Sequence, residues 1–471
     1  MRIWTSETVD KIGEVVEVKG WVQTRRDHGK LIFIDLRDRS GLLQCVFFSG
    51  NEELFEKAGQ LRSEYVVALK GTIKQRGERQ INPDLPTGTV EMAVDSLEIL
   101  NESETPAFEI EKAAEVSEDR RMTYRYLDMR SERMKNNLEK RHQIVKLIRD
   151  ELDSQKFWEI ETPYLTKGTP EGAREFVVPA RLSPGKFYVL PQSPQQFKQL
   201  LMVGGVERYF QIARCFRDED TRGDRQAEFT QLDLEMSFVE REDVMALNEA
   251  LLIKIVETLY PEKRIQQVPF PRLTYGEAME KYGTDRPDLR ENKDDPNLLA
   301  FAWVVDFPFF EKTNKQEHHG AEGEWTFTHN PFSAPIPEHR EWLMNKENIG
   351  EILTTQYDVV LNGYEIGGGS IRNHRPDALR KVLEIIGHKP ENIERDFGHM
   401  LRAFAYGAPP HGGIAWGLER LVMVLQNEPS IRDVMAFPKT GDSRDLLMDA
   451  PNIVNENTLK ELGIKSTTEP K

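Results

Sequence analysis

The sequence has little of the material from which disulfide scaffolds, zinc clusters and membrane spans are built. Only two of its 471 residues are cysteines, Cys45 and Cys215, too few for a disulfide framework or a four-cysteine zinc site. Both lie in apolar, strand-like runs, which predicts buried thiols in a reducing compartment. No apolar run approaches the roughly 18 residues that a membrane helix needs, and no charged-then-apolar leader begins the chain. These absences predict a cytoplasmic protein with no membrane segment.

Positive charge is also in deficit. The chain carries 79 acidic against 63 basic residues, a formal net charge of −16. This excess argues against a non-specific DNA coat but is compatible with a locally basic nucleic-acid surface. A composition of 38% hydrophobic and 30% charged residues is typical of a globular chain with a core. At about 150 residues per domain, the length predicts about three domains, or one large catalytic domain with smaller neighbours.

The first hundred residues read as a series of short strands. Runs rich in Val, Ile, Leu and Phe occupy residues 14–22, 31–36, 42–48, 65–73 and 89–100. Turn signals separate these runs, and a polar segment with helical character follows the third. Five strands with a helix after the third is the order of an OB-fold barrel, which often binds single-stranded nucleic acid or oligosaccharide. Strand count alone does not distinguish such a module from a small barrel without a ligand.

The charge pattern changes sign after the strand-rich region. Residues 101–119 contain seven acids and one lysine, which predicts a solvated hinge, and residues 120–150 contain ten bases and four acids. A long amphipathic helix is expected there, because Met134, Leu138, Val145, Ile148 and Leu152 recur at helical spacing. A charge run of this kind favours a solvated helix face over RNA contact. We predict a barrel domain at 1–103, a linker at 104–131, a catalytic domain at 132–450 and a polar tail at 451–471.

The most informative segment is 208–238. In its second half, Gln231, Asp233, Glu235 and Ser237 alternate with apolar residues, so one face of a strand carries an amide and two carboxylates. Such a face is either exposed to solvent or lines a polar pocket. An arginine-rich loop joins this strand to a preceding one, and a pair of strands with that loop suits a nucleoside triphosphate. Arg217 at the end of the first strand can hold an α-phosphate through two parallel hydrogen bonds.

A second cluster spans residues 356–372. Asn362-Gly363 between apolar runs is a strong hairpin signal, and it pairs Val360 with Glu365. Asp358 and Glu365 then become diagonal neighbours on one face. Two carboxylates placed so close repel each other unless a cation lies between them, and Mg²⁺ carrying ATP phosphates would remove the conflict. Two exposed carboxylates screened by water are the alternative.

A third cluster, Gly412 to Arg420, is a glycine-rich join between a strand and a helix that begins near Arg420. By itself such a join is usually structural. Together, however, three blocks resemble motifs 1, 2 and 3 of the class II aminoacyl-tRNA synthetases, in that order. The blocks are residues 156–163 (KFWEIETP), 216–219 with Phe229 (FRDE…F), and 417–420 (GLER).

Further strings make the resemblance more specific. Residues 169–173 (TPEGA), 195–198 (QQFK), Gln226 and 364–372 (YEIGGGSIR) look like those of bacterial-type aspartyl-tRNA synthetases. The resemblance covers residues 2 to about 451. It implies an α+β fold, with an N-terminal OB-fold barrel and a class II catalytic domain of antiparallel sheet with flanking helices. It also implies activation of L-aspartate with ATP and Mg²⁺, transfer to tRNA-Asp, and a homodimer with Pro163 at its interface.

The resemblance assigns roles to individual residues. Those implied for catalysis are Arg217, Glu365 and Arg420. Those implied for aspartate are Glu171, Gln195, Lys198, Arg217, Asp233, His329 and Arg372. Lys198 and Arg372 would receive the β-carboxylate. An asparagine substrate would leave these two cations unpaired, at a cost of about 2–5 kcal/mol.

Other roles concern nucleotide, metal and RNA. Those implied for ATP are Arg217, Asp218, Glu219, Gln226, Glu365, Gly417, Leu418, Glu419 and Arg420. Asp358 and Glu365 would bind Mg²⁺. Those implied for the anticodon are Arg26, His28, Phe33, Gln44 and Asn82. Base stacking on Phe33 would contribute about 1–3 kcal/mol, although a core position for this aromatic is the alternative.

The chain departs from the bacterial pattern at one place. Only twelve residues, Glu291–Ala302, separate two segments between which bacterial members carry a large inserted domain, so we predict that the insert is missing. A second expectation concerns His28, because in the bacterial synthetases that the chain resembles, a histidine rather than a leucine in this turn accompanies relaxed choice between tRNA-Asp and tRNA-Asn. We therefore predict charging of tRNA-Asn as well as tRNA-Asp.

Three other functions remain open from the sequence. One is an asparaginyl- or lysyl-tRNA synthetase, which shares the barrel and the three motifs; the cations Lys198 and Arg372 oppose it. Another is a paralogue that makes a free amide from the adenylate, which would need no anticodon reader. The last is an inactive RNA-binding module, which would be expected to have lost residues such as Arg217 and Asp358.

Overall fold

The computed structural model describes residues 2–168, 172–313 and 323–467. The chain divides into two compact units, Met1–Lys135 and Asn136–Lys471. The division falls within the long helix α4 (Glu132–Ser154). Three apolar positions predicted for this helix, Met134, Ile148 and Leu152, are buried. The three boundaries predicted between the four parts of the chain stay predictions.

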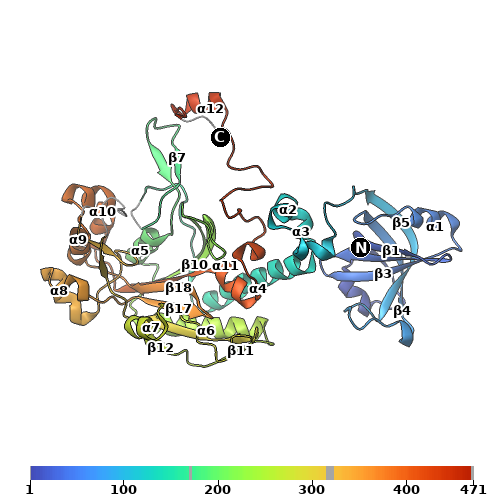
Figure 1. The fold of residues 1–471 in the computed structure, drawn as a ribbon, viewed down its shortest axis with the longest axis horizontal. Coiled ribbons are helices and arrows are strands. Elements are labelled where there is room, and N and C mark those ends of the chain that lie inside the picture. The colour runs from blue at the N-terminus through green and yellow to red at the C-terminus, as the bar shows by residue number, and fades with distance from the viewer. Residues whose placement is uncertain (1, 169–171, 314–322, 468–471) are drawn as a thin grey trace. The chain divides into compact units, whose positions relative to one another are not determined.

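The first unit contains a closed five-stranded barrel, drawn in blue in Figure 1. Its strands are β1 (Val15–Asp27), β2 (Leu31–Asp38), β3 (Gly41–Phe48), β4 (Val66–Gln75) and β5 (Val90–Asn101), in the order β1-β2-β3-β5-β4. Helix α1 (Glu52–Gly59) follows the third strand, as predicted. The two 3-10 helices here are η1 (Thr5–Asp10) and η2 (Glu78–Gln80). Cys45 lies in the barrel core, so the predicted burial of this thiol is confirmed.

The predicted linker at 104–131 has short helices of its own. It contains η3 (Ile110–Glu115), α2 (Glu118–Thr123) and α3 (Arg125–Asp128). Arg125 and Asp128 form a buried ion pair with a 2.5 Å contact. A buried charge is stable only when paired, and here the pairing is local, between two residues of one helical turn.

The second unit is built on an eight-stranded mixed sheet. Its order is β12-β14-β17-β18-β19-β10-β9-β6, antiparallel except for the pairs β12–β14 and β6–β9 at its two ends. The strands are β6 (Trp158–Glu159), β9 (Arg208–Phe216), β10 (Glu228–Ser237), β12 (Arg272–Thr274), β14 (Phe301–Val305), β17 (Tyr357–Leu361), β18 (Tyr364–Ile371) and β19 (His411–Gly417). The expected antiparallel sheet with flanking helices is therefore confirmed.

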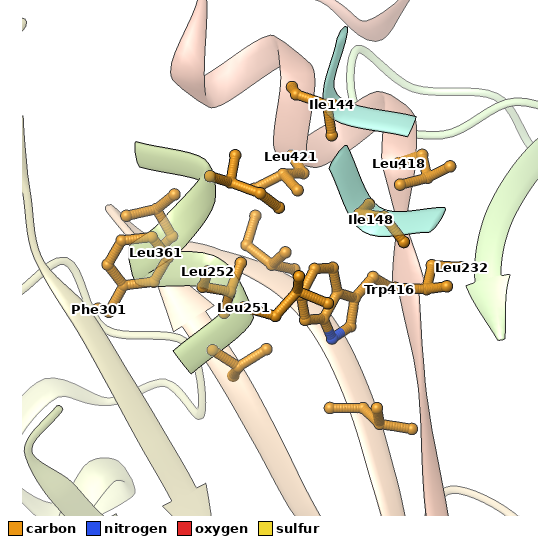
Figure 2. Close-up of a cluster of buried hydrophobic side chains, with 14 of the residues drawn as sticks. Ile144, Ile148, Leu232, Leu251, Leu252, Phe301, Leu361, Trp416, Leu418 and Leu421 are labelled. Atoms are coloured by element: carbon orange, nitrogen blue, oxygen red, sulfur yellow. The ribbon is translucent and has the colours of Figure 1, made fainter. Parts of the chain in front are cut away.

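One face of this sheet is covered by helices. Residues of α4, of α6 (Arg241–Leu259) and of α11 (Leu418–Leu425) pack with apolar strand residues in the largest core. Figure 2 shows Ile144, Leu252 and Leu421 gathered around the fully buried Trp416 of β19. Because side chains alternate along a strand, the polar residues of β10 are directed to the opposite face.

The second unit also contains helices and short strands outside this sheet. The helices are α5 (Gln195–Val203), α7 (Tyr275–Tyr282), α8 (Arg340–Asn345), α9 (Pro376–Ile385), α10 (Pro390–Phe404) and α12 (Glu456–Glu461), with 3-10 helices η4 (Pro337–His339), η5 (Ile349–Glu351) and η6 (Ile431–Val434). The short strands are β7 (Val177–Pro179), β8 (Phe187–Val189), β11 (Arg264–Ile265), β13 (Leu298–Leu299), β15 (Phe310–Lys312) and β16 (Trp325–Phe327). Within the described residues, no helix has the length and apolar character needed to cross a bilayer.

Candidate active site

Strand β10 places carboxylates inside the protein rather than on its surface. Its apolar residues Leu232 and Leu234 belong to the core beneath the sheet. Asp233 and Glu235, on the other face, are also fully buried. Gln231 and Asp233 line a cavity of about 1040 Å³. Of the two interpretations that the alternating pattern left open, the polar pocket is therefore correct.

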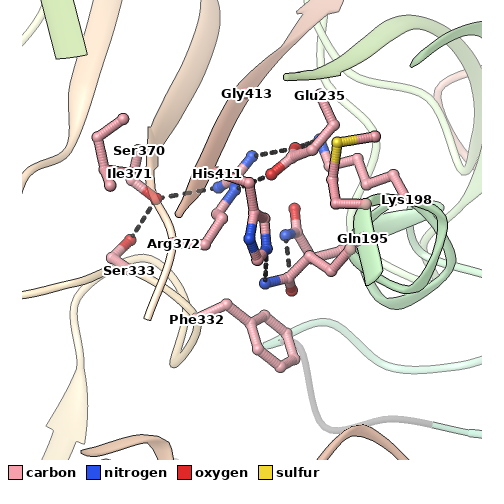
Figure 3. A network of polar contacts seen from close by, with 12 residues as sticks. Gln195, Lys198, Glu235, Phe332, Ser333, Ser370, Ile371, Arg372, His411 and Gly413 are labelled. Atoms are coloured by element: carbon pink, nitrogen blue, oxygen red, sulfur yellow. Dashed lines mark hydrogen bonds and ion pairs between the residues drawn. The ribbon is translucent and has the colours of Figure 1, made fainter. Parts of the chain in front are cut away.

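Two cations meet these carboxylates. Nζ of Lys198, on α5, lies 2.5 Å from Asp233 and 3.2 Å from Glu235. Arg372, directly after β18, donates from Nε to Oε1 of Glu235 at 2.9 Å and from Nη2 to Oε2 at 3.0 Å. Figure 3 shows Glu235 between the two cations. Lys198, Arg372 and Asp233 all line the cavity.

Glu235 anchors this cluster. Burial acts to raise the pKa of Glu235, but the charges of Arg372 and Lys198 outweigh it and lower the pKa to about 2. Its carboxylate is therefore ionised at neutral pH. Arg372 also donates to Ser370 Oγ at 3.0 Å, and these three contacts leave N–H donors of the guanidinium unused among the described residues. The cluster thus holds both cations in place without exhausting the capacity of Arg372 to bind a further carboxylate.

The second carboxylate pair comes from the β17–β18 hairpin. The predicted pairing of Val360 with Glu365 is confirmed, and Asn362 and Gly363 form the turn with positive φ angles. A bulge between Val359 and Val360 shifts the register, so that Asp358 lies opposite Gly368. A Cβ added to Gly368 would lie 2.6 Å from Oδ1 of Asp358 and 3.6 Å from Oε1 of Glu365. Both carboxylates therefore lie over the same glycine, facing the cavity.

The charges of this pair are in conflict. The pKa of Asp358 is raised well above its usual range, first by burial and second by the negative charge of Glu365. Gln356 Nε2 donates to Oδ1 of Asp358 at 3.1 Å. Within the described ranges, no cluster of three or more metal-ligating side chains is present. Two carboxylates whose repulsion a cation would relieve suit Mg²⁺, which usually takes its other ligands from water and phosphate.

The predicted phosphate-binding arginines lie at and beside the same cavity. Arg217 lines it, with its guanidinium carbon 5.1 Å from the ring centre of Phe229. Glu219 lines it as well. Arg420 donates from Nη1 to the backbone carbonyl of Glu365, itself a lining residue, and from Nη2 to Asp224 at 3.3 Å. The arginines of motifs 2 and 3 are thus brought together around one space.

Other residues expected at ATP have different surroundings. Leu418 is buried in the helix-covered core, and Gly417 is the N-cap of α11. The carboxylate of Glu419 accepts from the backbone N–H of Thr230 at 3.0 Å and pairs with Arg141 at 2.8 Å. The predicted roles of these three residues in ATP binding stay predictions.

Two more ATP predictions concern the loop between β9 and β10. Asp218 is exposed, and its backbone pairs with that of Arg174. Gln226 is buried, and its Oε1 accepts from the backbone N–H of Lys439 at 2.8 Å. The roles of both residues stay predictions.

The remaining residues expected at aspartate are placed as follows. Gln195, on α5, lines the cavity, as does His329, whose Nε2 lies 3.8 Å from Oδ2 of Asp358. Glu171 lies outside the described residues.

Most of the residues expected at the anticodon share one patch of the barrel. Arg26 and Phe33 are paired across β1 and β2, and the ring of His28 meets that of Phe33 edge-on at 5.5 Å. Arg26 also contacts Gln44 at 3.4 Å. Phe33 is half-buried and stands outside the barrel core, so the alternative of a core aromatic is wrong. Asn82 lies in a separate turn, where its side chain accepts from the N–H of Asp84.

Three buried residues of the site were not predicted. Glu235 carried a signal, because it shares the polar face of its strand with Asp233. Gln199 follows Gln195 by one helical turn, and its side chain accepts from Gln195 Nε2 at 3.1 Å. His411, from β19, contacts Gln199 at 3.1 Å. Nothing local in the sequence indicates the last contact, since its partners lie 212 positions apart.

Comparisons with known proteins agree with this geometry. Residues 117–441 match the family of class II tRNA synthetases (D, K and N), and residues 16–100 match the OB-fold nucleic acid binding domain. A relative from Halothermothrix orenii, named aspartate–tRNA(Asp/Asn) ligase, is 42% identical over 97% of each chain. An aspartate–tRNA ligase from Macrococcus caseolyticus is 40% identical over 98% of each chain.

Solved structures show the same fold. The asparaginyl-tRNA synthetase from Pyrococcus horikoshii, complexed with asparaginyl-adenylate, has a TM-score of 0.74 and 25% identity, over 93% of this chain and 98% of that one. An aspartyl-tRNA synthetase from Entamoeba histolytica has a TM-score of 0.72 at 23% identity, over 93% and 91% of the two chains. With the cavity described above, these similarities establish that the chain belongs to the class II aminoacyl-tRNA synthetases and, among them, to the family of the aspartate–tRNA ligases.

Proposed function

We propose that this synthetase activates L-aspartate with ATP and charges both tRNA-Asp and tRNA-Asn. The curated relatives support the proposal, because most of those nearest in sequence are named aspartate–tRNA(Asp/Asn) ligases. The observation that carries the choice of amino acid is the meeting of Lys198 and Arg372 in one cavity. Two cations held at this depth match the side-chain carboxylate of aspartate.

We assign binding residues to the α-ammonium and α-carboxylate groups of aspartate as well. Asp233 would receive the α-ammonium group, and Gln195 would contribute its amide oxygen. Arg217 would hold both the α-carboxylate and the α-phosphate, since its planar guanidinium offers paired N–H donors. Stacking on Phe229 fixes the plane of that guanidinium. The amino acid is then oriented with its α-carboxylate toward the nucleotide.

The first reaction is an in-line displacement. An oxygen of the α-carboxylate forms a bond to the α-phosphorus of ATP, the bond to the bridging oxygen breaks, and pyrophosphate leaves with its electron pair. Catalysis here consists of positioning and of neutralising charge on the phosphate oxygens. Arg217 at the α-phosphate and Arg420 at the distal phosphate provide the cations that position the phosphates and neutralise their charge. In the second reaction a ribose hydroxyl of the tRNA attacks the activated carbonyl, and AMP leaves.

Asp358 and Glu365 would hold Mg²⁺. Bound there, the ion would neutralise phosphate charge and remove the repulsion between the two carboxylates. The oxygen-only donor set and the raised pKa of Asp358, caused first by burial and then by Glu365, support this assignment. His329, which lines the same cavity, would also contact the substrate.

The barrel would read the anticodon. Phe33 offers a ring for base stacking, and Arg26 offers donors for phosphate or base edges. Gln44 lies beside Arg26 on this patch, and Asn82 would add a further contact from its turn. His28, packed edge-on against Phe33, would accept either anticodon. Both tRNAs would receive the same amino acid from the same cavity. The choice of tRNA therefore depends on this patch of the barrel and not on the cavity.

The competing functions fit less well. A lysyl-tRNA synthetase would need carboxylates where the substrate side chain binds, whereas Lys198 and Arg372 place two cations there. An asparagine substrate would leave Arg372 and Lys198 without the carboxylate that they match. A free-amide synthetase would not need the barrel, and an inactive module would not need the arginines around the cavity.

Three further predictions are retained. A homodimer is supported by exposed apolar side chains around Pro163, namely Trp158, Tyr164 and Leu165. The cytoplasmic location is the expected setting for charging tRNA. The missing inserted domain between residues 290 and 303 also stays a prediction.

Charging of purified tRNAs tests the proposal. We expect aspartate-dependent charging of tRNA-Asp and tRNA-Asn, and none of an unrelated tRNA. If tRNA-Asn is charged no better than the unrelated tRNA, the dual specificity is wrong while the aspartate assignment stands. If tRNA-Asp is not charged either, the proposed function is wrong.

A further inference from the structure

A chain of buried polar contacts runs from β19 to the wall of the cavity. It starts at the carbonyl oxygen of Pro409, passes through the side chains of His411 and Gln199, and ends at Gln195. Gln199 and His411 are completely buried, whereas Gln195 lines the cavity. Figure 3 shows the His411 ring beside Gln195, next to Glu235 and Lys198.

The chemistry of the contacts sets the direction of each hydrogen bond. A carbonyl oxygen only accepts, so Nδ1 of His411 donates to Pro409 over the 2.7 Å contact. Burial lowers the pKa of His411, although the charge of Glu235 acts in the other direction. The ring is therefore neutral, with its Nε2 as an acceptor. Nε2 of Gln199 then donates to it across 3.1 Å.

The same logic orients the two glutamines. Since the amide nitrogen of Gln199 is directed to His411, its carbonyl oxygen accepts from Nε2 of Gln195, also at 3.1 Å. The amide of Gln195 is thereby held with its nitrogen toward the helix and its carbonyl oxygen toward the cavity. An oxygen there attracts an ammonium group, whereas an inverted amide would present N–H donors to it and repel it.

We propose that His411 and Gln199 are positioning residues, which fix the amide of Gln195 so that its oxygen accepts from the α-ammonium group of the amino acid. Neither residue touches the substrate. They affect the orientation of a single amide. The ammonium group is present both before and during adenylate formation, so this amide contacts it equally in both states. His411 and Gln199 therefore act on the binding of the amino acid. The inference rests on the proposed function, in which Gln195 binds aspartate.

The structure provides a matched control. On the same helix, Gln196 is also buried and makes a similar contact, from its Oε1 to Nε2 of His399 at 2.6 Å. That pair lines a separate cavity of about 380 Å³, to which Gln195 and Lys198 do not contribute. Gln196→Met therefore removes an equivalent glutamine–histidine contact from α5 without touching the proposed chain.

The test is aspartate-dependent ATP–pyrophosphate exchange by the full chain, with KM and kcat measured separately. Gln199→Met should raise the KM for aspartate by about 10- to 150-fold, the loss expected for a hydrogen bond to a charged group, with kcat within about twofold. Gln196→Met should leave both constants unchanged. His411→Leu should resemble Gln199→Met, and His411→Gln should restore the KM, because its amide can both donate to Pro409 and accept from Gln199.

A double-mutant cycle makes the test specific. Gln195→Ala should raise the KM by itself, and adding Gln199→Met should raise it no further, since Gln199 acts only through Gln195. Additive effects, or an unchanged KM in Gln199→Met, would overturn the inference while leaving the proposed function intact. If Gln199→Met does not fold, the His411→Leu and His411→Gln pair decides by the same criterion. A parent enzyme without aspartate-dependent exchange would instead refute the proposed function itself.

Discussion

The guanidinium of Arg372 holds the carboxylate of Glu235 edge-on, with contacts of 2.9 and 3.0 Å, and both side chains are buried. This pair fixes the guanidinium at the wall of the cavity, which Arg372 lines. The guanidinium would otherwise be an isolated buried cation, and an isolated buried charge costs several kcal/mol. The pair is therefore part of both the stability of the fold and the choice of substrate.

Loss of Glu235 should destabilise the protein in a pH-dependent way. Its pKa of about 2 lies below the ordinary glutamate value, so its contribution is present above about pH 4.5 and is lost as the pH falls through 2. We expect Glu235→Gln to lower the free energy of unfolding by about 3 kcal/mol at pH 7. Denaturant titrations at several pH values measure this, and the difference from the parent should shrink below pH 4. A constant difference at every pH would contradict the electrostatic explanation.

Replacement of Lys198 should abolish the use of aspartate. Lys198→Leu removes one of the two cations at the predicted β-carboxylate site and leaves Asp233 and Glu235 to repel that group. We expect aspartate-dependent pyrophosphate exchange to fall by about 100-fold or more in kcat/KM. Lys254→Leu, at an exposed lysine of α6, is the control. Unchanged exchange in a folded Lys198→Leu enzyme would refute the pocket assignment.

A methyl group at Gly368 should disturb the predicted metal site. The added Cβ would lie 2.6 Å from Oδ1 of Asp358, which forces that carboxylate to move away from Glu365. We expect Gly368→Ala to need a Mg²⁺ concentration about tenfold higher for half-maximal exchange, which corresponds to about 1.4 kcal/mol. Gly441→Ala meets no atom within 4 Å and serves as the control. An identical Mg²⁺ dependence of the two variants would show that the carboxylates do not bind the ion.

His28 should influence the choice of tRNA without affecting activation. His28→Leu changes the side chain that packs against Phe33, so we expect charging of tRNA-Asn to fall about tenfold relative to tRNA-Asp, about 1.4 kcal/mol. Pyrophosphate exchange, which needs no tRNA, should not change. Lys30→Leu, two residues further in the same turn, should affect the two tRNAs equally. An unchanged ratio of the two charging rates in His28→Leu would remove the basis for assigning tRNA choice to this turn.

Local patterns predicted much of the fold. The Asn362-Gly363 turn specified the pairing of Val360 with Glu365, and the alternation along β10 specified which of its side chains face the core. The bulge was not predicted, although Gly367 directly follows its extra residue, Ile366 of β18. Nor did the sequence indicate the short helices between residues 110 and 128, since their buried pair of Arg125 and Asp128 looks like ordinary surface charge in a sequence.

The contacts between distant segments could not be read from local patterns. Lys198, Glu235 and Arg372 come from α5, from β10 and from the end of β18, and only the folded sheet brings them together. The resemblance to a family supplied Lys198 and Arg372 but not the glutamate between them. The link from His411 to Gln199 likewise joins β19 to α5, and no periodicity connects two such positions.

ATP–pyrophosphate exchange with aspartate, asparagine and lysine in turn tests the central claim most directly. The claim is that Lys198 and Arg372 select an acidic side chain in the cavity where Arg217 meets ATP. It predicts that aspartate supports exchange, whereas asparagine and lysine do so at least about 100-fold less well in kcat/KM. Comparable exchange with asparagine or lysine, or none with aspartate, would contradict it.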